Sequence, residues 1–122
     1  MDNREPSANR KALSMLGLAA RAGKTASGEF SCERSVKSGK AALLILAGDA
    51  SDNTKKKFEN MCVYYEVPLA FSAGKEALGK AIGKELRSCV SVEDPGFALQ
   101  IKKLIDLSAN SSEYTIGKGA VY

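Results

Sequence analysis

The stretch Thr25-Ala-Ser-Gly-Glu-Phe-Ser-Cys-Glu-Arg-Ser-Val-Lys-Ser-Gly-Lys40 decides the fold, because it has the pattern of a strand end, a glycine turn and a helix of nearly three turns. The helix is predicted to begin after Gly28, with Ser27 capping the free amides of its first turn. Gly39 stands where a residue in the left-handed conformation ends many helices. The apolar run 41–47 follows, and it is typical of an interior strand that is covered on both faces.

This predicted helix has two contrasting faces at about 100° of rotation per residue. One face is small and apolar and would pack on a sheet: Cys32, Ser35, Val36 and Gly39. The opposite face carries an aromatic residue beside two cations: Phe30, Arg34 and Lys37. One interpretation is a stacking surface for a nucleic-acid base, with cations for the phosphates. The other is a phenylalanine that is tucked under a neighbouring loop.

Helices alternate with short strands along the rest of the chain. The predicted elements are a helix over 8–22, the unit described above, a helix over 53–64, a strand over 67–71, a helix from a cap at Ser72 to 83, a strand over 88–92 and a helix that begins at Asp94-Pro95. This alternation predicts the α/β class, with a three-layer α/β/α sandwich. We expect one domain over 1–107, followed by a polar, flexible tail over 108–122.

Positive charge is concentrated in the first half of the chain. The net charge is +4; residues 1–61 carry 11 Lys and Arg against 7 Asp and Glu, whereas residues 62–122 carry 7 of each kind. An acidic partner such as nucleic acid would therefore meet the first half. We predict that five cations there form one continuous basic surface: Arg21, Lys24, Arg34, Lys37 and Lys40. For Arg21 and Lys24 the alternative is that they only complement the carboxyl end of the first helix.

The sequence offers little for catalysis or for metal binding. It contains no histidine, and it has no nucleophile elbow, Walker loop or paired-carboxylate motif. The three cysteines are widely spaced, so they form neither a disulfide framework nor a zinc motif, and we predict that Cys32 and Cys89 are buried thiols. No apolar run is long enough to span a membrane, and residues 1–7 do not resemble a secretory signal. We therefore expect a cytoplasmic protein without cofactor or metal that is not an enzyme.

Six short segments carry a resemblance to a known family through their order and spacing. They are Leu16-Gly-Leu-Ala-Ala-Arg-Ala-Gly-Lys24, Ser38-Gly-Lys-Ala41, Ala47-Gly-Asp-Ala50, Asn53-Thr-Lys-Lys56, Val67-Pro68 and Leu78-Gly-Lys-Ala-Ile-Gly83. Their arrangement resembles the L7Ae/L30e family of kink-turn RNA-binding ribosomal proteins, and most of all its bacterial YlxQ-type branch. The resemblance implies a mixed four-stranded sheet between helices, binding of structured RNA and no catalysis.

In that family, RNA meets the turn that opens the second helix, where the usual pattern is Gly-Thr-Asn-Glu with a lysine further on. Gly28 matches the glycine and Arg34 the cation, whereas Glu29, Phe30 and Ser31 stand in place of Thr, Asn and Glu. The family's Asn and Glu contact the edges of sheared G·A pairs, and Phe and Ser do not reproduce those bonds. The resemblance therefore implies that helix amides and cations hold an RNA backbone, and it leaves kink-turn specificity open.

The family also contacts RNA through the loop before the last strand. Glu85-Leu-Arg87 correspond to an apolar contact with an extruded base, for which Leu86 is the candidate; the alternative is an ordinary loop at a strand entry. The predicted RNA-binding residues are Arg21, Lys24, Gly28, Glu29, Phe30, Ser31, Arg34, Lys37, Lys40, Glu85, Leu86 and Arg87.

Two functions from different classes follow. The first is a non-catalytic, monomeric RNA-binding protein of the translation machinery, with ribosomal RNA or the ribosome as candidate partners and no contact with a membrane. The second is a translation-associated adaptor that binds proteins without gripping RNA, and it would use Phe30 and Leu86 as apolar anchors.

Overall fold

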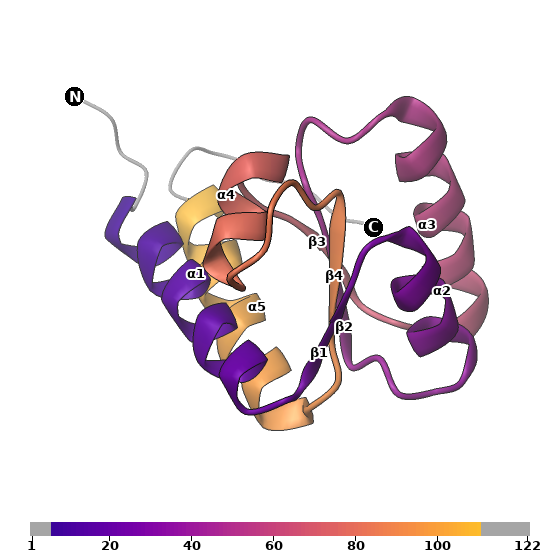
Figure 1. Ribbon diagram of the computed structural model, residues 1–122, viewed down its shortest axis with the longest axis horizontal. Coiled ribbons are helices and arrows are strands. Elements are labelled where there is room, and N and C mark those ends of the chain that lie inside the picture. Colours follow the sequence, from indigo (N-terminus) through magenta and orange to yellow (C-terminus); the bar gives the residue numbers. More distant parts are fainter. Residues whose placement is uncertain (1–5, 111–122) are drawn as a thin grey trace.

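The computed structural model describes residues 6–110, in which five helices enclose a four-stranded sheet (Figure 1). The elements follow in the order α1 (Pro6–Arg21), β1 (Thr25–Ser27), α2 (Glu29–Lys37), β2 (Leu43–Leu46), α3 (Asp52–Tyr65), β3 (Leu69–Phe71), α4 (Lys75–Ala81), β4 (Cys89–Val92) and α5 (Pro95–Asn110). The predicted alternation of helices and strands is confirmed.

The strands lie in the order β1-β4-β2-β3. Strand β4 pairs antiparallel with both β1 and β2, whereas β3 pairs parallel with β2, so the sheet is mixed as expected. All four residues of β2 and all four of β4 are buried, which fits their interior positions. Pro68 comes directly before the edge strand β3, a position where the amide hydrogen that proline lacks is not needed for strand pairing.

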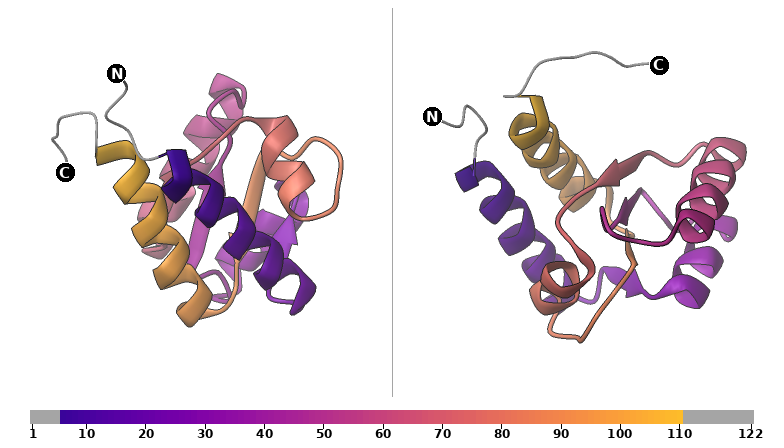
Figure 2. Two further views of the ribbon diagram at one scale, coloured as in Figure 1. Left: turned by 90° about the vertical axis from the view of Figure 1, so that its left-hand side faces the viewer. Right: turned by 90° about the horizontal axis from the view of Figure 1, so that it is seen from above.

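Two hydrophobic cores, one on each face of the sheet, give the molecule three layers. Helices α1, α4 and α5 cover one face, and their largest buried side chains include Leu16, Leu78 and Ile101. Helices α2 and α3 cover the other face, where Val36 and Phe58 are fully buried. Figure 2 shows this division from above, with the strands between the two groups of helices. The predicted α/β/α sandwich is confirmed.

The expected cap at the start of α2 is wrong. Ser27 is the last residue of β1 and is paired with Val90, and its hydroxyl accepts a hydrogen bond from Arg87 Nε at 3.1 Å. The helix is preceded by Gly28 at φ 86°, a left-handed conformation that favours glycine, and no side chain caps its first turn. The amides of that turn are therefore left without a side-chain acceptor.

The expected cap at Ser72 is also wrong. Helix α4 begins at Lys75, and the Lys75 amide donates to Asp49 Oδ1 at 2.8 Å, from a loop 26 residues earlier. The Ser72 hydroxyl instead donates to Asn9 on α1 at 3.2 Å. Both predictions fail for the same reason: each serine hydroxyl bonds a residue from a distant segment, Arg87 or Asn9, and not the nearby helix amides.

The start of α5 is as predicted, since the Phe97 amide donates to Asp94 Oδ2 at 2.8 Å and Pro95 is the first helical residue. The helix continues to Asn110, which is past the expected domain boundary at 107. The rest of the expected tail, 111–122, lies outside the described residues. No helix within residues 6–110 is both long enough and apolar enough to cross a membrane.

All three cysteines are buried free thiols, as predicted for Cys32 and Cys89. They share the core beneath α2 and α3. Burial, followed by the neighbouring Cys89, raises the pKa of Cys62 to about 11. The Cys89 thiol, followed by burial, raises the pKa of Cys32 far above its ordinary value. Cys32 and Cys62 are therefore protonated at neutral pH. All three buried side chains pack as small apolar groups.

A buried polar contact fixes α2 on the sheet. The Ser35 hydroxyl donates to Glu93 Oε2 at 2.7 Å and lies 2.7 Å from the Ser91 hydroxyl on β4. Ser35 and Ser91 are almost completely buried, so neither hydroxyl can exchange its partner for bulk water. This contact sets how α2 lies across β4.

Replacing Ser35 with alanine is therefore expected to lower the free energy of unfolding by about 1–3 kcal/mol, because the partner groups lose a buried hydrogen bond. Urea unfolding of Ser35→Ala and of Ser38→Ala would measure it. Ser38 is an exposed residue of the same segment with only a 3.3 Å bond to the Ser35 carbonyl, so its change should stay within about 0.5 kcal/mol. Equal losses in the two variants would contradict the role of Ser35.

The loop over 82–88, which joins α4 to β4, packs tightly on α4. A Cβ added at Gly79 would overlap the Glu85 carbonyl oxygen and lie 2.6 Å from its carbon. The loop thus rests directly on the bare backbone of Gly79, and only glycine fits there.

Gly79→Ala is expected to destabilise the fold by about 1–3 kcal/mol, the usual effect of overpacking. The better helix propensity of alanine, worth about 1 kcal/mol, opposes this effect but does not cancel a collision with backbone atoms. Thermal denaturation would compare Gly79→Ala with Lys80→Ala, which changes the next, exposed residue of the same helix. A Gly79→Ala variant as stable as the unsubstituted protein would show that the loop is free to move away.

Candidate nucleic-acid interface

The turn before α2 and the loop over 82–88 lie against each other. The Gly28 amide donates to the Cys89 carbonyl at 3.1 Å, one residue beyond the β1–β4 pairing. Arg87 Nε donates to Ser27 Oγ, and Arg87 Nη1 donates to the Leu86 carbonyl at 2.9 Å. Arg87 therefore ties the loop to the end of β1. These are the two segments through which the family resemblance implies contact with RNA.

Each of the two segments exposes a large apolar side chain. Phe30 in the first turn of α2 is 73% exposed, and Leu86 on the loop is 59% exposed. The prediction that Phe30 points away from the core is confirmed, and the alternative that it is tucked under a loop is wrong. The Arg34 guanidinium lies 5.8 Å from the centre of the Phe30 ring, so the aromatic and cationic groups form one surface.

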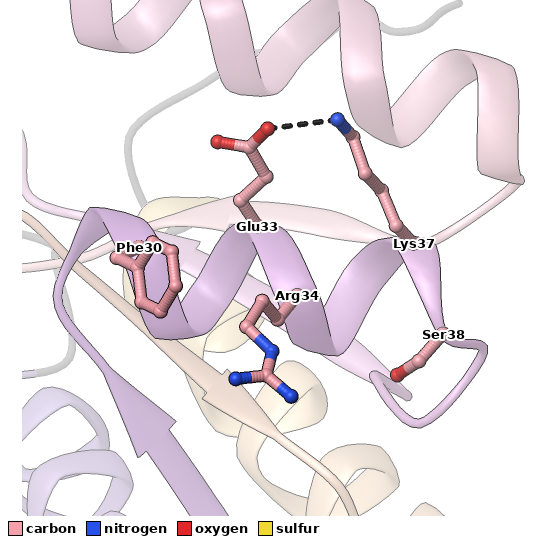
Figure 3. Close-up of a pocket in the computed structure, with 5 residues that line it drawn as sticks. All are labelled: Phe30, Glu33, Arg34, Lys37 and Ser38. Carbon is pink, nitrogen blue, oxygen red and sulfur yellow. Dashed lines mark hydrogen bonds and ion pairs between the residues drawn. The ribbon is translucent and has the colours of Figure 1, made fainter.

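Phe30 and Arg34 line an open hollow of about 430 Å³ on α2, together with Glu33, Lys37 and Ser38 (Figure 3). Figure 3 shows that Glu33 and Lys37 point to one side of the helix and Arg34 to the other. The flat ring and the guanidinium are the groups on which a planar ligand could stack.

The acidic residues of α2 are engaged with α3. Glu33 lies 2.8 Å from Lys37 and 3.0 Å from Lys57, and these two ammonium groups lower the pKa of Glu33. The Glu33 carboxylate in turn raises the pKa of Lys37. Glu29 accepts a hydrogen bond from Thr54 at 2.9 Å and lies 3.8 Å from Lys57. Two of the predicted RNA-binding residues, Glu29 and Lys37, thus already have partners in the protein.

A second hollow lies on the other side of α2, between the helix and the end of β4. It measures about 250 Å³ and is lined by Ser31, Arg34, Ser35, Ser38, Lys40 and Glu93. We call it the serine groove. Sequence reasoning missed Ser35, Ser38 and Glu93 as parts of a site. The spacing of Ser31, Ser35 and Ser38 along one side of the helix is a signal that could have pointed to the serines, but no local pattern relates Glu93 to α2.

The five predicted cations do not all gather in one place. Arg34 lines both hollows, with Lys37 in the first and Lys40 in the serine groove. The Lys24 carbonyl accepts the Glu93 amide at 2.8 Å, so Lys24 lies at the end of β1 away from Gly28. Arg21 instead lines a separate groove between α1 and α4 with Lys80. Three of the five predicted cations therefore line the hollows on α2, and of these Lys37 is paired with Glu33, whereas Arg34 and Lys40 line the serine groove.

The remaining predicted residues have structural surroundings of their own. Ser31 is exposed and lines the serine groove. Glu85 is exposed, and its carbonyl packs on Gly79. Within residues 6–110, no group of three or more His, Cys, Asp or Glu residues is placed to hold a metal ion.

Solved structures with this fold include two that cover most of the chain. One, described as a protein with unknown function from Bacillus halodurans C, superposes with a TM-score of 0.76 at 42% identity, covering 79% of this chain and 97% of that chain. The Giardia lamblia 15.5kD RNA binding protein superposes with a TM-score of 0.70 over 88% of this chain and 92% of its own, and at 21% identity it supports the fold alone.

Sequence comparison identifies the family. Residues 10–102 match the Ribosomal protein L7Ae/L30e/S12e/Gadd45 family. A protein of Bacillus subtilis (strain 168) named RNA-binding protein YlxQ is 44% identical over 92 residues, which cover 75% of this chain and 92% of that protein. A protein of Enterococcus faecium with the same name is 39% identical over 97 residues, covering 80% and 93% respectively. The chain therefore belongs to the ribosomal protein L7Ae/L30e/S12e/Gadd45 family and to its YlxQ-type branch.

Proposed function

We propose that this protein binds structured RNA through the surface formed by the start of α2 and the loop over 82–88. The observation that carries the proposal is the exposed Phe30 ring with the Arg34 guanidinium 5.8 Å from its centre. Two family members that align over most of their length carry the name RNA-binding protein YlxQ, which supports the same class of ligand.

Each part of this surface offers RNA a different contact. Phe30 stacks on an unpaired base, and Leu86 covers a second apolar face of the ligand. The amides of the first turn of α2, which no side chain caps, donate to a phosphate at the positive end of the helix dipole. Arg34 pairs with the next phosphate along the strand. Recognition therefore rests on stacking and on the RNA backbone.

The chemistry of this surface favours RNA with unpaired bases over a regular duplex. The positions of Phe30 and Ser31 carry no amide or carboxylate that could bond the base edges of sheared G·A pairs. Kink-turn RNA is then one member of the class that the protein binds, since it displays an extruded base, and the G·A pairs themselves are not read. Ribosomal RNA supplies such folded targets to a monomeric, cytoplasmic protein of the translation machinery.

A direct test is fluorescence anisotropy with three labelled RNAs, a kink-turn, a regular duplex and an unstructured strand, each at two salt concentrations. We expect the kink-turn to bind more tightly than the duplex, with an affinity that falls as salt rises. The absence of binding to all three RNAs at low salt would reject the proposal. That outcome would favour a protein-binding adaptor, for which the exposed Phe30 and Leu86 would serve as apolar anchors.

Phe30→Ala is expected to weaken RNA binding by about 1–3 kcal/mol, the usual value of one base–aromatic stack. The salt dependence of the affinity should change little, because a phenyl ring releases no counterions. The matched control is Val63→Ala, which removes an 80% exposed apolar side chain from α3. If the control lowers the affinity as much as Phe30→Ala does, stacking on Phe30 is not the cause.

Arg34→Ala is expected to weaken binding and also to flatten the plot of log affinity against log salt by about 0.7–0.9, the value of one phosphate contact. A salt titration of Arg34→Ala and of Lys103→Ala, an exposed cation on α5, would measure the difference. Thermal melts would accompany both, since neither exposed side chain supports the core. An unchanged slope for Arg34→Ala would rule out a phosphate contact at this residue.

A further inference from the structure

Helix α2 has two sides that differ in how their charges are paired. On the side toward α3, Glu33 lies within 3.0 Å of both Lys37 and Lys57, and Glu29 lies 3.8 Å from Lys57. Two carboxylates and two ammonium groups there neutralise one another. Figure 3 shows the bond between Glu33 and Lys37 on this side of the helix. A phosphate that approached Lys37 would have to compete with a carboxylate that is already in place.

The serine groove on the other side has cations without such partners. Among residues 6–110, neither Arg34 nor Lys40 has a carboxylate oxygen within 4.0 Å that would make an ion pair, although both line this groove. The exposed serines Ser31 and Ser38 lie between them along the helix. Hydroxyl groups and unpaired cations are the side chains that commonly contact phosphate oxygens.

Glu93 is the one acidic residue that lines the groove, and it is held at the wall by the fold. Its Oε2 accepts the Ser35 hydroxyl at 2.7 Å, and its amide donates to the Lys24 carbonyl. The two cations outnumber this carboxylate, so the groove keeps a positive charge for an anionic chain. The carboxylate forms part of its wall next to β4.

The serine groove adjoins the hollow that Phe30 lines, because Arg34 and Ser38 line both. Arg34 comes four residues after Phe30, about 6 Å along the helix axis, and it lines both hollows. Beyond the end of α2, Gly39 at φ 81° turns the chain, and the Lys40 amide donates back to the Ser35 carbonyl at 3.1 Å. This turn brings Lys40 alongside the helix. Phe30, Arg34 and Lys40 thus follow one another along a single side of α2.

We propose that the sugar–phosphate backbone of the bound RNA leaves Phe30 along the serine groove, with successive phosphates at Arg34 and Lys40. The inference rests on the proposed function and adds the direction in which the strand runs. It assigns Lys40, and not Lys37, as the second phosphate contact of α2.

The two lysines provide a matched pair for the test. Both are exposed, both carry one positive charge, and they are three residues apart. The experiment is a salt titration of kink-turn RNA binding with the full chain, carried out for Lys40→Ala and for Lys37→Ala. We expect Lys40→Ala to flatten the slope of log affinity against log salt by about 0.7–0.9 and Lys37→Ala to leave it unchanged. Thermal melts check that both variants remain folded.

The outcomes separate this inference from the proposed function. If Lys37→Ala flattens the slope as much as Lys40→Ala or more, the strand does not run along the serine groove, while RNA binding itself stands. If neither variant changes the slope, the backbone leaves α2 before Lys40 and the inference is equally overturned. If the unsubstituted protein binds none of the three RNAs at low salt, the proposed function has failed.

Discussion

The hydrogen bond from the Gly28 amide to the Cys89 carbonyl extends the β1–β4 pairing past the last strand residue, and the whole candidate surface depends on it. It fixes the turn before α2 against the start of β4, so that the loop before β4 has to lie beside that turn. Arg87 adds a side-chain bond across the same junction, and the contact at Gly79 supports the loop from α4. Two segments about sixty residues apart thereby form one surface on a rigid sheet.

The ion pairs on the side of α2 that faces α3 affect the charge of the surface more than the stability of the fold. They lie on the surface, where such pairs contribute little to stability because solvent screens them. Their greater effect is on the distribution of charge, because they remove Lys37 and Lys57 from the set of cations that are open to a ligand. The net charge of the chain therefore does not locate an anion-binding site. The site is better located by which cations of α2 lack a carboxylate partner.

Much of the fold follows from local pattern, and the errors have a common physical cause. The apolar run 41–47 predicted the interior strand, the period of α2 placed Phe30 outward, and Asp94-Pro95 marked the start of α5. The helix caps at Ser27 and Ser72 were wrong because partners from distant segments override the local rule. Glu93 joins α2 only through the strand pairing of β4, 58 residues from Ser35, so no sequence window contains both parts of the groove.

The three enclosed thiols beneath α2 and α3 have a consequence for how the protein can be studied. Reagents such as maleimides attack the ionised form of an accessible cysteine, and here all three thiols are buried, while the raised pKa values of Cys32 and Cys62 disfavour their ionised forms. Alkylation then has to wait until this half of the structure opens, so its rate measures how often the core beneath α2 and α3 becomes accessible. The chain has no tryptophan, but its three cysteines can report local opening of the core. This core lies beneath α2, the helix that we propose contacts RNA.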